Sequence, residues 1–189
     1  MPGLVVVDPG HGGADPGAVG ATGLEEAQVV LAVCRRVEQY LKRLGYRVLM
    51  TRTDGRGLAL AERAVMANRA GADTFISVHA NAAADRRAQG LEVWHPRPSD
   101  RRGQIAGAMA LCLLRWLLVA TGRRDRGLKF TEDPVREFTV LRSTRMPAVL
   151  VELAFLSNPA EAYLLAQEWF QEKAALGIAA GIQAFHSLP

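Results

Sequence analysis

The sequence predicts a single α/β domain in which helices flank a largely parallel, mixed sheet of six strands. Short β-branched runs alternate along the chain with patterns of helical period, as in proteins built around a parallel sheet. No long linker, low-complexity tract or internal repeat interrupts the 189 residues. Because a chain of this length can bury a core in one domain, we expect residues 1–189 to form one α/β sandwich.

Six runs of β-branched and other apolar residues are expected to form the strands. In chain order they are Leu4–Asp8, Tyr46–Thr51, Thr74–His79, Gly90–Trp94, Phe138–Leu141 and Ala148–Phe155. Runs of this length and composition are typical of strands.

Apolar residues at steps of three and four predict the helices that alternate with these strands. The first helix is marked by Val30, Val33, Val37, Leu41 and Leu44 and ends at Gly45. A second is marked by Ala61, Ala64, Val65 and Asn68 before Gly71, and a third by Ile105, Met109, Cys112, Trp116 and Val119 before Gly122. Asn158-Pro159 is expected to open a fourth, and Ile178, Ile182 and Phe185 mark the last.

The composition argues against several classes of function. The net charge is +4, but the arginines occur as pairs without interleaved aromatic residues, so we expect no nucleic-acid partner. The apolar stretch Ala110–Ala120 is too short to span a bilayer and contains Arg115, so we expect a core helix there and no membrane span. Cys34 and Cys112 lie within helical patterns and are expected to be core residues rather than a disulfide or metal ligands.

Two histidines fall at the expected carboxyl ends of strands, where sites form in α/β sheets, and a pair of glutamates is expected on the same side of the sheet. His11 lies in the glycine-rich loop after the first strand, His79 ends the third strand, and Glu25-Glu26 opens the first long helix. Two histidines and one glutamate are a ligand set for catalytic zinc, with a fourth position left open. The alternatives are an exposed loop histidine and acidic residues that favour the helix dipole.

Glu152 is a carboxylate inside the apolar run Ala148–Phe155. Burying a carboxylate is unfavourable unless it is paired or functional. Glu152 is therefore either the partner of an arginine in a structural ion pair, or a general base that takes a proton from water and later returns it.

Several ordered segments resemble the zinc-dependent N-acetylmuramoyl-L-alanine amidases of the AmiC/CwlV type, from about residue 4 to the C-terminus. They include Asp8-Pro-Gly-His-Gly-Gly-Ala-Asp-Pro-Gly-Ala18, Gly23-Leu-Glu-Glu26, Ser77-Val-His-Ala-Asn81 and Met146-Pro-Ala-Val-Leu-Val-Glu152. The resemblance implies a zinc-hydrolase-like fold and one zinc ion per chain, held by His11, Glu26 and His79. It also implies that Glu152 is the catalytic residue. A one-residue slip would put Glu25 in the ligand position, and that alternative stays open.

The resemblance further implies hydrolysis of the amide bond between N-acetylmuramic acid and L-alanine in peptidoglycan. A zinc peptidase acting on other peptides and an inactive wall-binding module are the alternatives. Asn81, Lys129 and Arg142 are candidate substrate contacts. Arg52 and Arg63 are expected to hold loops or helices through ion pairs.

We expect a monomer that acts on the cell wall, outside the cytoplasmic membrane. The N-terminus does not read as a signal peptide, so a trimmed leader, a phage lysin and mother-cell lysis all stay open. Related amidases carry an extra helix that blocks the zinc site until an activator removes it. A single predicted helix from Arg102 to Thr121 leaves little room for such an insertion. We therefore expect activity without an activator, and no separate wall-binding domain.

Overall fold

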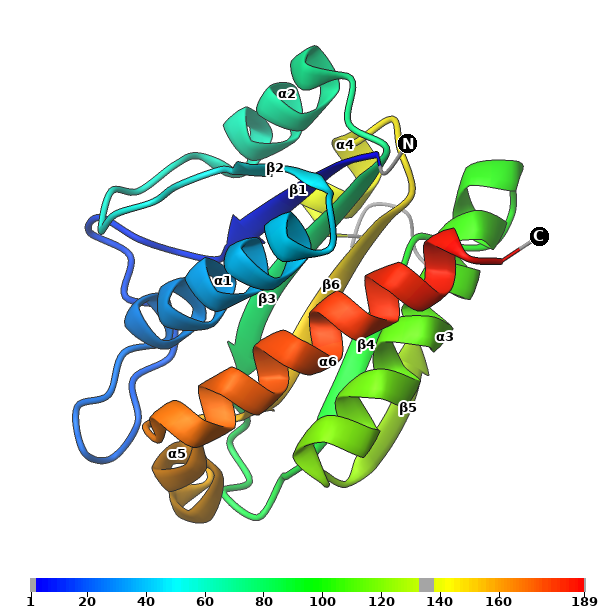
Figure 1. Cartoon of the computed structure of the whole chain (residues 1–189). Coiled ribbons are helices and arrows are strands. Elements are labelled where there is room, and N and C mark those ends of the chain that lie inside the picture. Colours follow the sequence, from blue (N-terminus) through cyan, green and yellow to red (C-terminus); the bar gives the residue numbers. More distant parts are fainter. Residues whose placement is uncertain (1–2, 133–137, 189) are drawn as a thin grey trace.

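A sheet of six strands runs through the middle of the protein, whose computed structural model describes residues 3–132 and 138–188 (Figure 1). The strands are β1 (Leu4–Pro9), β2 (Arg47–Met50), β3 (Thr74–Asn81), β4 (Leu91–Trp94), β5 (Asp125–Lys129) and β6 (Ala148–Phe155). They lie in the order β2-β1-β3-β6-β4-β5. β2, β1, β3 and β6 are parallel to one another. β4 is antiparallel to β6, and β5 is parallel to β4. The predicted mixed, largely parallel sheet is confirmed.

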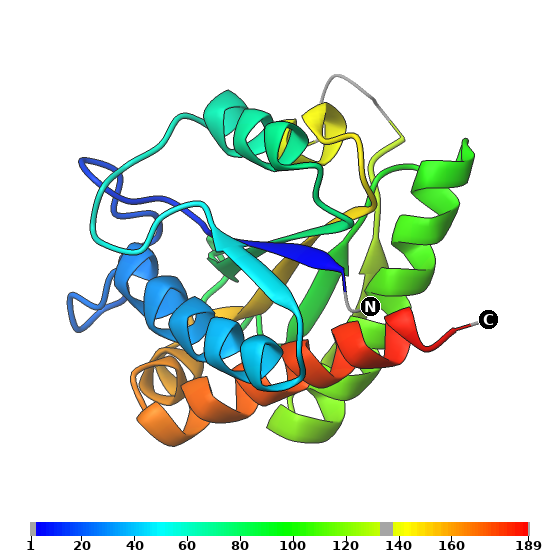
Figure 2. The same cartoon turned by 45° about the horizontal axis from the view of Figure 1, so that its top comes forward.

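Helices cover both faces of the sheet and give the protein three layers (Figure 2). α1 (Glu26–Arg43), α3 (Arg101–Thr121) and α6 (Glu168–His186) lie on one face, and α2 (Leu60–Ala70) and α4 (Thr139–Ser143) lie on the other. The short helix α5 (Pro159–Leu165) follows β6. Because both faces are covered, Val5, Val6 and Val7 are all fully buried, which explains why the inner strands are continuous apolar runs.

α3 and α6 approach each other closely because α6 has glycines at the contact. A Cβ atom at Gly177 would lie 3.0 Å from Leu117 Cα, and one at Gly181 would lie 2.8 Å from Leu113 Cα. Any side chain at either position would therefore push the two helices apart. This packing, together with α1, encloses the larger of two apolar clusters, and α2 and α4 enclose the smaller one on the opposite face.

The predicted strand Phe138–Leu141 is wrong. Thr139–Ser143 forms the helix α4, and the sixth strand is β5, which pairs with β4 at the edge of the sheet. Leu128 is the only aliphatic residue of β5, so its composition gives no strand signal. An edge strand needs pairing on one side only and can leave its side chains half-exposed, which is why such a polar segment is tolerated there.

The predicted helices are present as α1, α2, α3, α5 and α6, but two of them bury a different side from the one predicted. In α2, Val65 is exposed and Arg63 is buried, because the Arg63 guanidinium forms an ion pair with Asp8. In α3, Trp116 and Val119 are 44% and 78% exposed. The residues that α3 buries are Gly103, Ala106, Met109, Ala110, Leu113, Leu114, Leu117 and Thr121. Since α3 is apolar on most sides, its period alone could not select the buried one.

The two cysteines are free, as predicted, with Cys34 fully buried and Cys112 half-buried. By length and composition alone, α3 is long and apolar enough to cross a membrane, as core helices of soluble proteins also are. One side of α3 packs against α6 and the sheet.

Candidate metal centre

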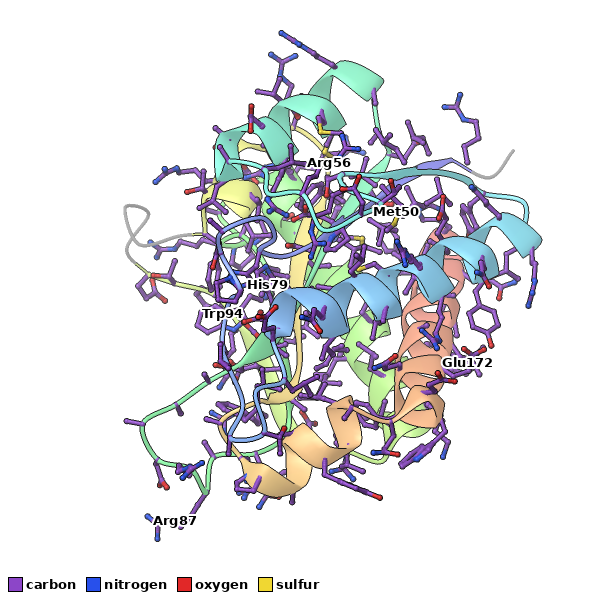
Figure 3. The ribbon with its side chains drawn as sticks, turned by 90° about the vertical axis from the view of Figure 1, so that its left-hand side faces the viewer. Met50, Arg56, His79, Arg87, Trp94 and Glu172 are labelled. Atoms are coloured by element: carbon purple, nitrogen blue, oxygen red, sulfur yellow. The ribbon has the colours of Figure 1, made fainter. Side chains whose placement is uncertain are left out.

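The first turn of α1 lies beside the carboxyl ends of the neighbouring strands β1 and β3. β1 and β3 are parallel neighbours, so the loop after Pro9 and the last residues of β3 emerge side by side. His11 lies in that loop, His79 lies near the end of β3, and Glu26 is the first residue of α1. Figure 3 shows His79 beside the beginning of α1. The topology therefore gathers three polar residues that are far apart in the sequence.

These three side chains converge on one point. Glu26 Oε1 lies 3.1 Å from His11 Nε2 and 2.9 Å from His79 Nδ1. The two imidazole rings are 4.9 Å apart and meet edge to face, with an interplanar angle of 79°. One possible ligand atom from each residue lies within 4.8 Å of the other two. Two imidazoles and a carboxylate at this spacing are suited to a shared metal ion.

The Glu26 carboxylate is buried but well supplied with partners. Its Oε1 also accepts a hydrogen bond from Ala80 N at 3.0 Å, and its Oε2 accepts one from Ala18 N at 2.9 Å. Burial alone would raise the pKa of Glu26, but the hydrogen bonds with His11 and His79 outweigh it and hold that pKa well below its usual range. Glu26 is therefore ionised at neutral pH, as a metal ligand must be. Glu25 instead accepts a hydrogen bond from Gln28 Nε2 at 2.7 Å.

His11 is held in an unusual backbone conformation and by a second carboxylate. Its φ of 59° is the only positive value among the described non-glycine residues. Such conformations persist where the surroundings enforce them, often at functional sites. His11 Nδ1 lies 2.8 Å from Asp15 Oδ2, and a proton donated there leaves Nε2 as the free ligand atom.

Two glycines give the histidine rings their space. A Cβ atom at Gly10 would lie 2.3 Å from His79 Cε1, and one at Gly17 would lie 2.8 Å from His11 Cδ2. Gly17 also has a φ of 68°, which side chains rarely adopt. The glycines of the loop therefore allow the backbone to approach both rings.

A buried polar network supports the loop from below. Asp8 accepts hydrogen bonds from Thr51 Oγ1 at 2.5 Å, Ser77 Oγ at 2.7 Å and Arg63 Nη1 at 2.8 Å. Arg63 also donates to Pro9 O at 2.6 Å and to His11 O at 2.7 Å. The Asp8–Arg63 ion pair is almost fully buried, so it holds the loop in one geometry.

Glu152 lies next to His79 on the neighbouring strand. The two residues are paired in register between β3 and β6, so their side chains leave the same face of the sheet. Glu152 is 9% exposed, and its Oε2 is buried without a hydrogen-bond partner in the described parts of the chain. Burial raises the pKa of Glu152 well above its usual range, and the charges of Glu26 and Glu92 raise it further. An arginine ion pair, the structural alternative for this residue, is not present among the described residues.

A cavity of about 740 Å³ opens over these groups. His11, Glu26, His79 and Glu152 all line it. Its other lining residues include an apolar set, namely Leu58, Leu60, Phe138, Val140 and Leu150. A cavity of this size, largely apolar with a few convergent polar groups, is typical of a site for a small ligand or a segment of a polymer.

Comparison with known proteins shows the family to which the chain belongs. The sequence profile of the N-acetylmuramoyl-L-alanine amidases known as Amidase_3 matches residues 5–184. The chain belongs to this family. It is 34% identical to the amidase AmiC of Neisseria meningitidis, covering 96% of this chain and 52% of that protein. It is 37% identical to the endolysin of Bacillus phage SPP1, covering 95% and 64%. The chain thus spans only about half to two thirds of the length of these two relatives.

Solved structures of amidases share the fold. The catalytic domain of CwlV, from Bacillus (Paenibacillus) polymyxa, is 36% identical with a TM-score of 0.89 and full coverage of both chains. An amidase of Clostridium difficile 630 is 31% identical with a TM-score of 0.90, covering 98% of this chain and 97% of the other. The fold described above is therefore that of an amidase catalytic domain.

The two sequence alignments differ in length. The alignment with the Neisseria amidase extends over 217 residues and that with the phage endolysin over 183, although each includes almost the same share of this chain. The Neisseria amidase therefore carries residues within the aligned region that have no counterpart here.

Only one of the three predicted substrate contacts lines the amidase cavity. Asn81 does so, and its Nδ2 donates to Glu92 Oε1 at 3.0 Å while its Oδ1 accepts from Ala82 N at 2.8 Å. Lys129 ends β5 and Arg142 is exposed on α4, and neither is among the described residues that line the cavity. Of the two arginines expected to form ion pairs, Arg63 does so with Asp8. Arg52 bonds backbone carbonyl groups instead.

Two residues of the site carried no role in the sequence interpretation. Asp15 contacts His11, and its place four residues after a proposed ligand was the available signal. Glu92 lies opposite Glu152 in the antiparallel ladder between β4 and β6. It accepts hydrogen bonds from Asn81, from Trp94 Nε1 at 3.0 Å and from Arg126 Nε at 2.8 Å. Nothing in the sequence around Glu92 indicates that β4 would lie beside β6.

Proposed function

We propose that this chain is a zinc-dependent amidase that hydrolyses the bond between N-acetylmuramic acid and L-alanine in peptidoglycan. The observation that carries the proposal is the convergence of His11 Nε2, Glu26 Oε1 and His79 Nδ1 beneath a cavity that also contains the unpartnered carboxyl of Glu152. Family membership supports this choice of bond, and the side chains are of the types that its hydrolysis requires.

The three proposed ligands fit zinc by their chemistry. Catalytic zinc takes three protein ligands from histidine and carboxylate, and keeps one position open. Glu26 is already ionised, and His11 is oriented by Asp15 so that Nε2 faces Glu26. A bound zinc ion would polarise the amide carbonyl, stabilise the charge that develops on its oxygen, and lower the pKa of nearby acids, Glu152 included.

Glu152 is the proposed proton carrier. As a carboxylate it takes a proton from the attacking water, and as an acid it returns that proton to the alanine nitrogen when the C–N bond breaks. It has no hydrogen-bond partner among the described residues that would compete for this proton. The buried surroundings that raise its pKa also favour return of the proton.

Digestion of purified muropeptides tests the reaction. The zinc-loaded protein should release intact stem peptides that begin with L-alanine and leave glycan without peptide. Shortened stems that remain attached to muramic acid would instead identify a peptidase. Tight wall binding without zinc and without cleavage would identify a wall-binding module.

We also propose that the chain acts as one catalytic domain on the cell wall and needs no activator. An extra helix that blocks the zinc site would require additional residues. The Neisseria amidase has residues within the aligned region that this chain lacks, whereas the phage endolysin aligns without such an excess. Assay of the purified protein alone tests this point, and activity that appears only with a second protein would contradict it.

A further inference from the structure

Arg52 has the largest fully buried side chain among the described residues, and its contacts are unusual. It is 2% exposed, and it forms no ion pair in the described parts of the chain. Its Nε donates to Pro9 O at 3.1 Å and its Nη1 to Asp54 O at 2.9 Å. A buried guanidinium without a carboxylate partner is unfavourable for folding, so a fold that keeps one needs a compensating reason.

The Nη2 atom of Arg52 joins the two segments that carry His11 and Glu26. It donates to Gly10 O at 2.7 Å and to Ala27 O at 2.8 Å. Gly10 immediately precedes His11, and Ala27 immediately follows Glu26. One nitrogen atom therefore bridges the backbone next to one proposed ligand and the backbone next to another.

The same residue, Gly10, is also tied to the third ligand segment. Gly10 N donates to Val78 O at 3.1 Å, and Val78 immediately precedes His79. Gly10 is thus joined through Arg52 to the segment that carries Glu26, and directly to the segment that carries His79. Arg63 differs, because its hydrogen bonds reach Asp8, Pro9, His11 and Leu58 but do not reach α1.

We propose that Arg52 is a positioning residue that sets the distance between His11 and Glu26 and thereby preorganises the metal centre. The inference rests on the proposed function, since it assumes that these residues bind zinc. The guanidinium suits this task because its planar fork fixes several carbonyl groups at once, whereas a lysine ammonium is a compact charge on a flexible chain.

Zinc affinity separates this role from a general contribution to folding. We would measure it by competition with a chromophoric chelator for the wild type, Arg52→Lys, Arg52→Met and Arg102→Met. Arg102 is the matched control, because its Nη1 donates to Leu141 O at 2.8 Å and to Thr144 O at 2.9 Å, and neither residue is among the described lining of the cavity that contains the ligands. Circular dichroism and urea unfolding of the zinc-free proteins report the fold.

Arg52→Met is expected to remain folded and to bind zinc about 10–100-fold more weakly, as for residues that orient metal ligands. Arg52→Lys should lose less, because its ammonium still reaches part of the carbonyl set. Arg102→Met should lower stability without changing zinc affinity. The visible absorption bands of the Co²⁺-loaded proteins should differ from wild type in the Arg52 variants only.

Three results would overturn the positioning role. They are a folded Arg52→Met with wild-type zinc affinity, an equal loss of affinity in Arg102→Met, and unfolding of both Arg52 variants without metal. The last would mean that Arg52 serves the fold as a whole. A wild-type protein that takes up no zinc would remove the proposed metal centre and this inference with it.

Discussion

Glu26 and Glu152 are both buried carboxyl groups at one cavity, yet their surroundings drive them to opposite states. Glu26, in the first turn of α1, is approached by His11, His79 and the backbone N–H groups of Ala18 and Ala80. Glu152, in the middle of β6, has a buried oxygen without a hydrogen-bond partner among the described residues. The pKa of Glu26 is held low by its partners despite burial, whereas burial raises the pKa of Glu152.

The difference shows that burial alone does not decide the charge of a carboxyl group. Partners that stabilise the charged form favour ionisation, and their absence favours the acid. Two carboxyl groups whose pKa values are pushed apart are suited to different tasks in one reaction. Glu26 is suited to hold a metal ion permanently, and Glu152 is suited to exchange a proton.

The largest expected effect comes from removing the partnered carboxylate. Glu26→Ala should lose bound zinc and at least about a thousandfold in turnover, because the metal's share of transition-state stabilisation is lost with it. Glu25→Ala is the neighbouring control and should keep both, since its carboxylate contacts Gln28. Zinc content and muropeptide turnover are the measurements. Loss of zinc in Glu25→Ala would reverse the assignment of the ligand.

Removing the unpartnered carboxyl should affect turnover but not the metal. Glu152→Gln is expected to lower turnover by about 10²–10⁴-fold, the usual contribution of a general acid–base group. Its zinc content should equal that of the wild type, because Glu152 is not a proposed ligand. Metal analysis and single-turnover kinetics on the same preparation test the pair of expectations. Turnover within a few-fold of wild type would take Glu152 out of the proton-transfer role.

A smaller effect is expected when the support of a ligand is weakened. Asp15→Asn should lower zinc affinity by about 10–100-fold, because the His11 ring loses the carboxylate that orients it. Asp85→Asn is a suitable control, since Asp85 is exposed and contacts Arg87 instead. Chelator competition measures both affinities. Equal affinity in Asp15→Asn and wild type would show that the loop alone orients His11.

The smallest expected effect is a gain in stability. In the zinc-free protein the pKa of Glu152 is raised above its ordinary 4.5, so the unfolded chain releases this proton first as pH rises. This group therefore lowers the free energy of unfolding increasingly above pH 4.5. Glu152→Gln lacks that loss, so its melting temperature relative to wild type should be higher at pH 7 than at pH 4.5. Thermal melts at pH 4.5 and pH 7 test the sign, and a gain confined to pH 4.5 would contradict it.

The sequence predicted most of the sheet but misplaced its outer strand. The inner strands are buried on both faces. Leu4–Pro9 and Ala148–Phe155 are therefore largely apolar runs, which the sequence alone indicates as strands. Asp125–Lys129 is polar and half-exposed, and it is a strand because β4 offers an open edge. Phe138–Leu141 resembles a strand in composition, but its residues pack as the short helix α4 against α2.

The sequence named candidate residues for the site but not their geometry. Local signals singled out His11 in a glycine-rich loop, Glu25-Glu26 at a helix start, and His79 and Glu152 in strands, and their roles as ligands and proton carrier stay predictions. The Glu25 alternative could not be resolved, because both residues lie at the helix start and only the direction of each side chain separates them. Lys129 and Arg142 stay predictions for substrate contacts, now with positions outside the described lining of the cavity.

By itself, the sequence determined the α/β class, the inner strands and the types of side chain available for chemistry. These follow from periodicity and composition, which are local properties of the chain. Only the tertiary structure decided that β4 lies antiparallel beside β6, that Glu92 therefore faces Glu152, and that Arg52 bridges the segments of His11 and Glu26. Such contacts join residues distant in sequence and depend on the packing of whole elements, so no local pattern records them.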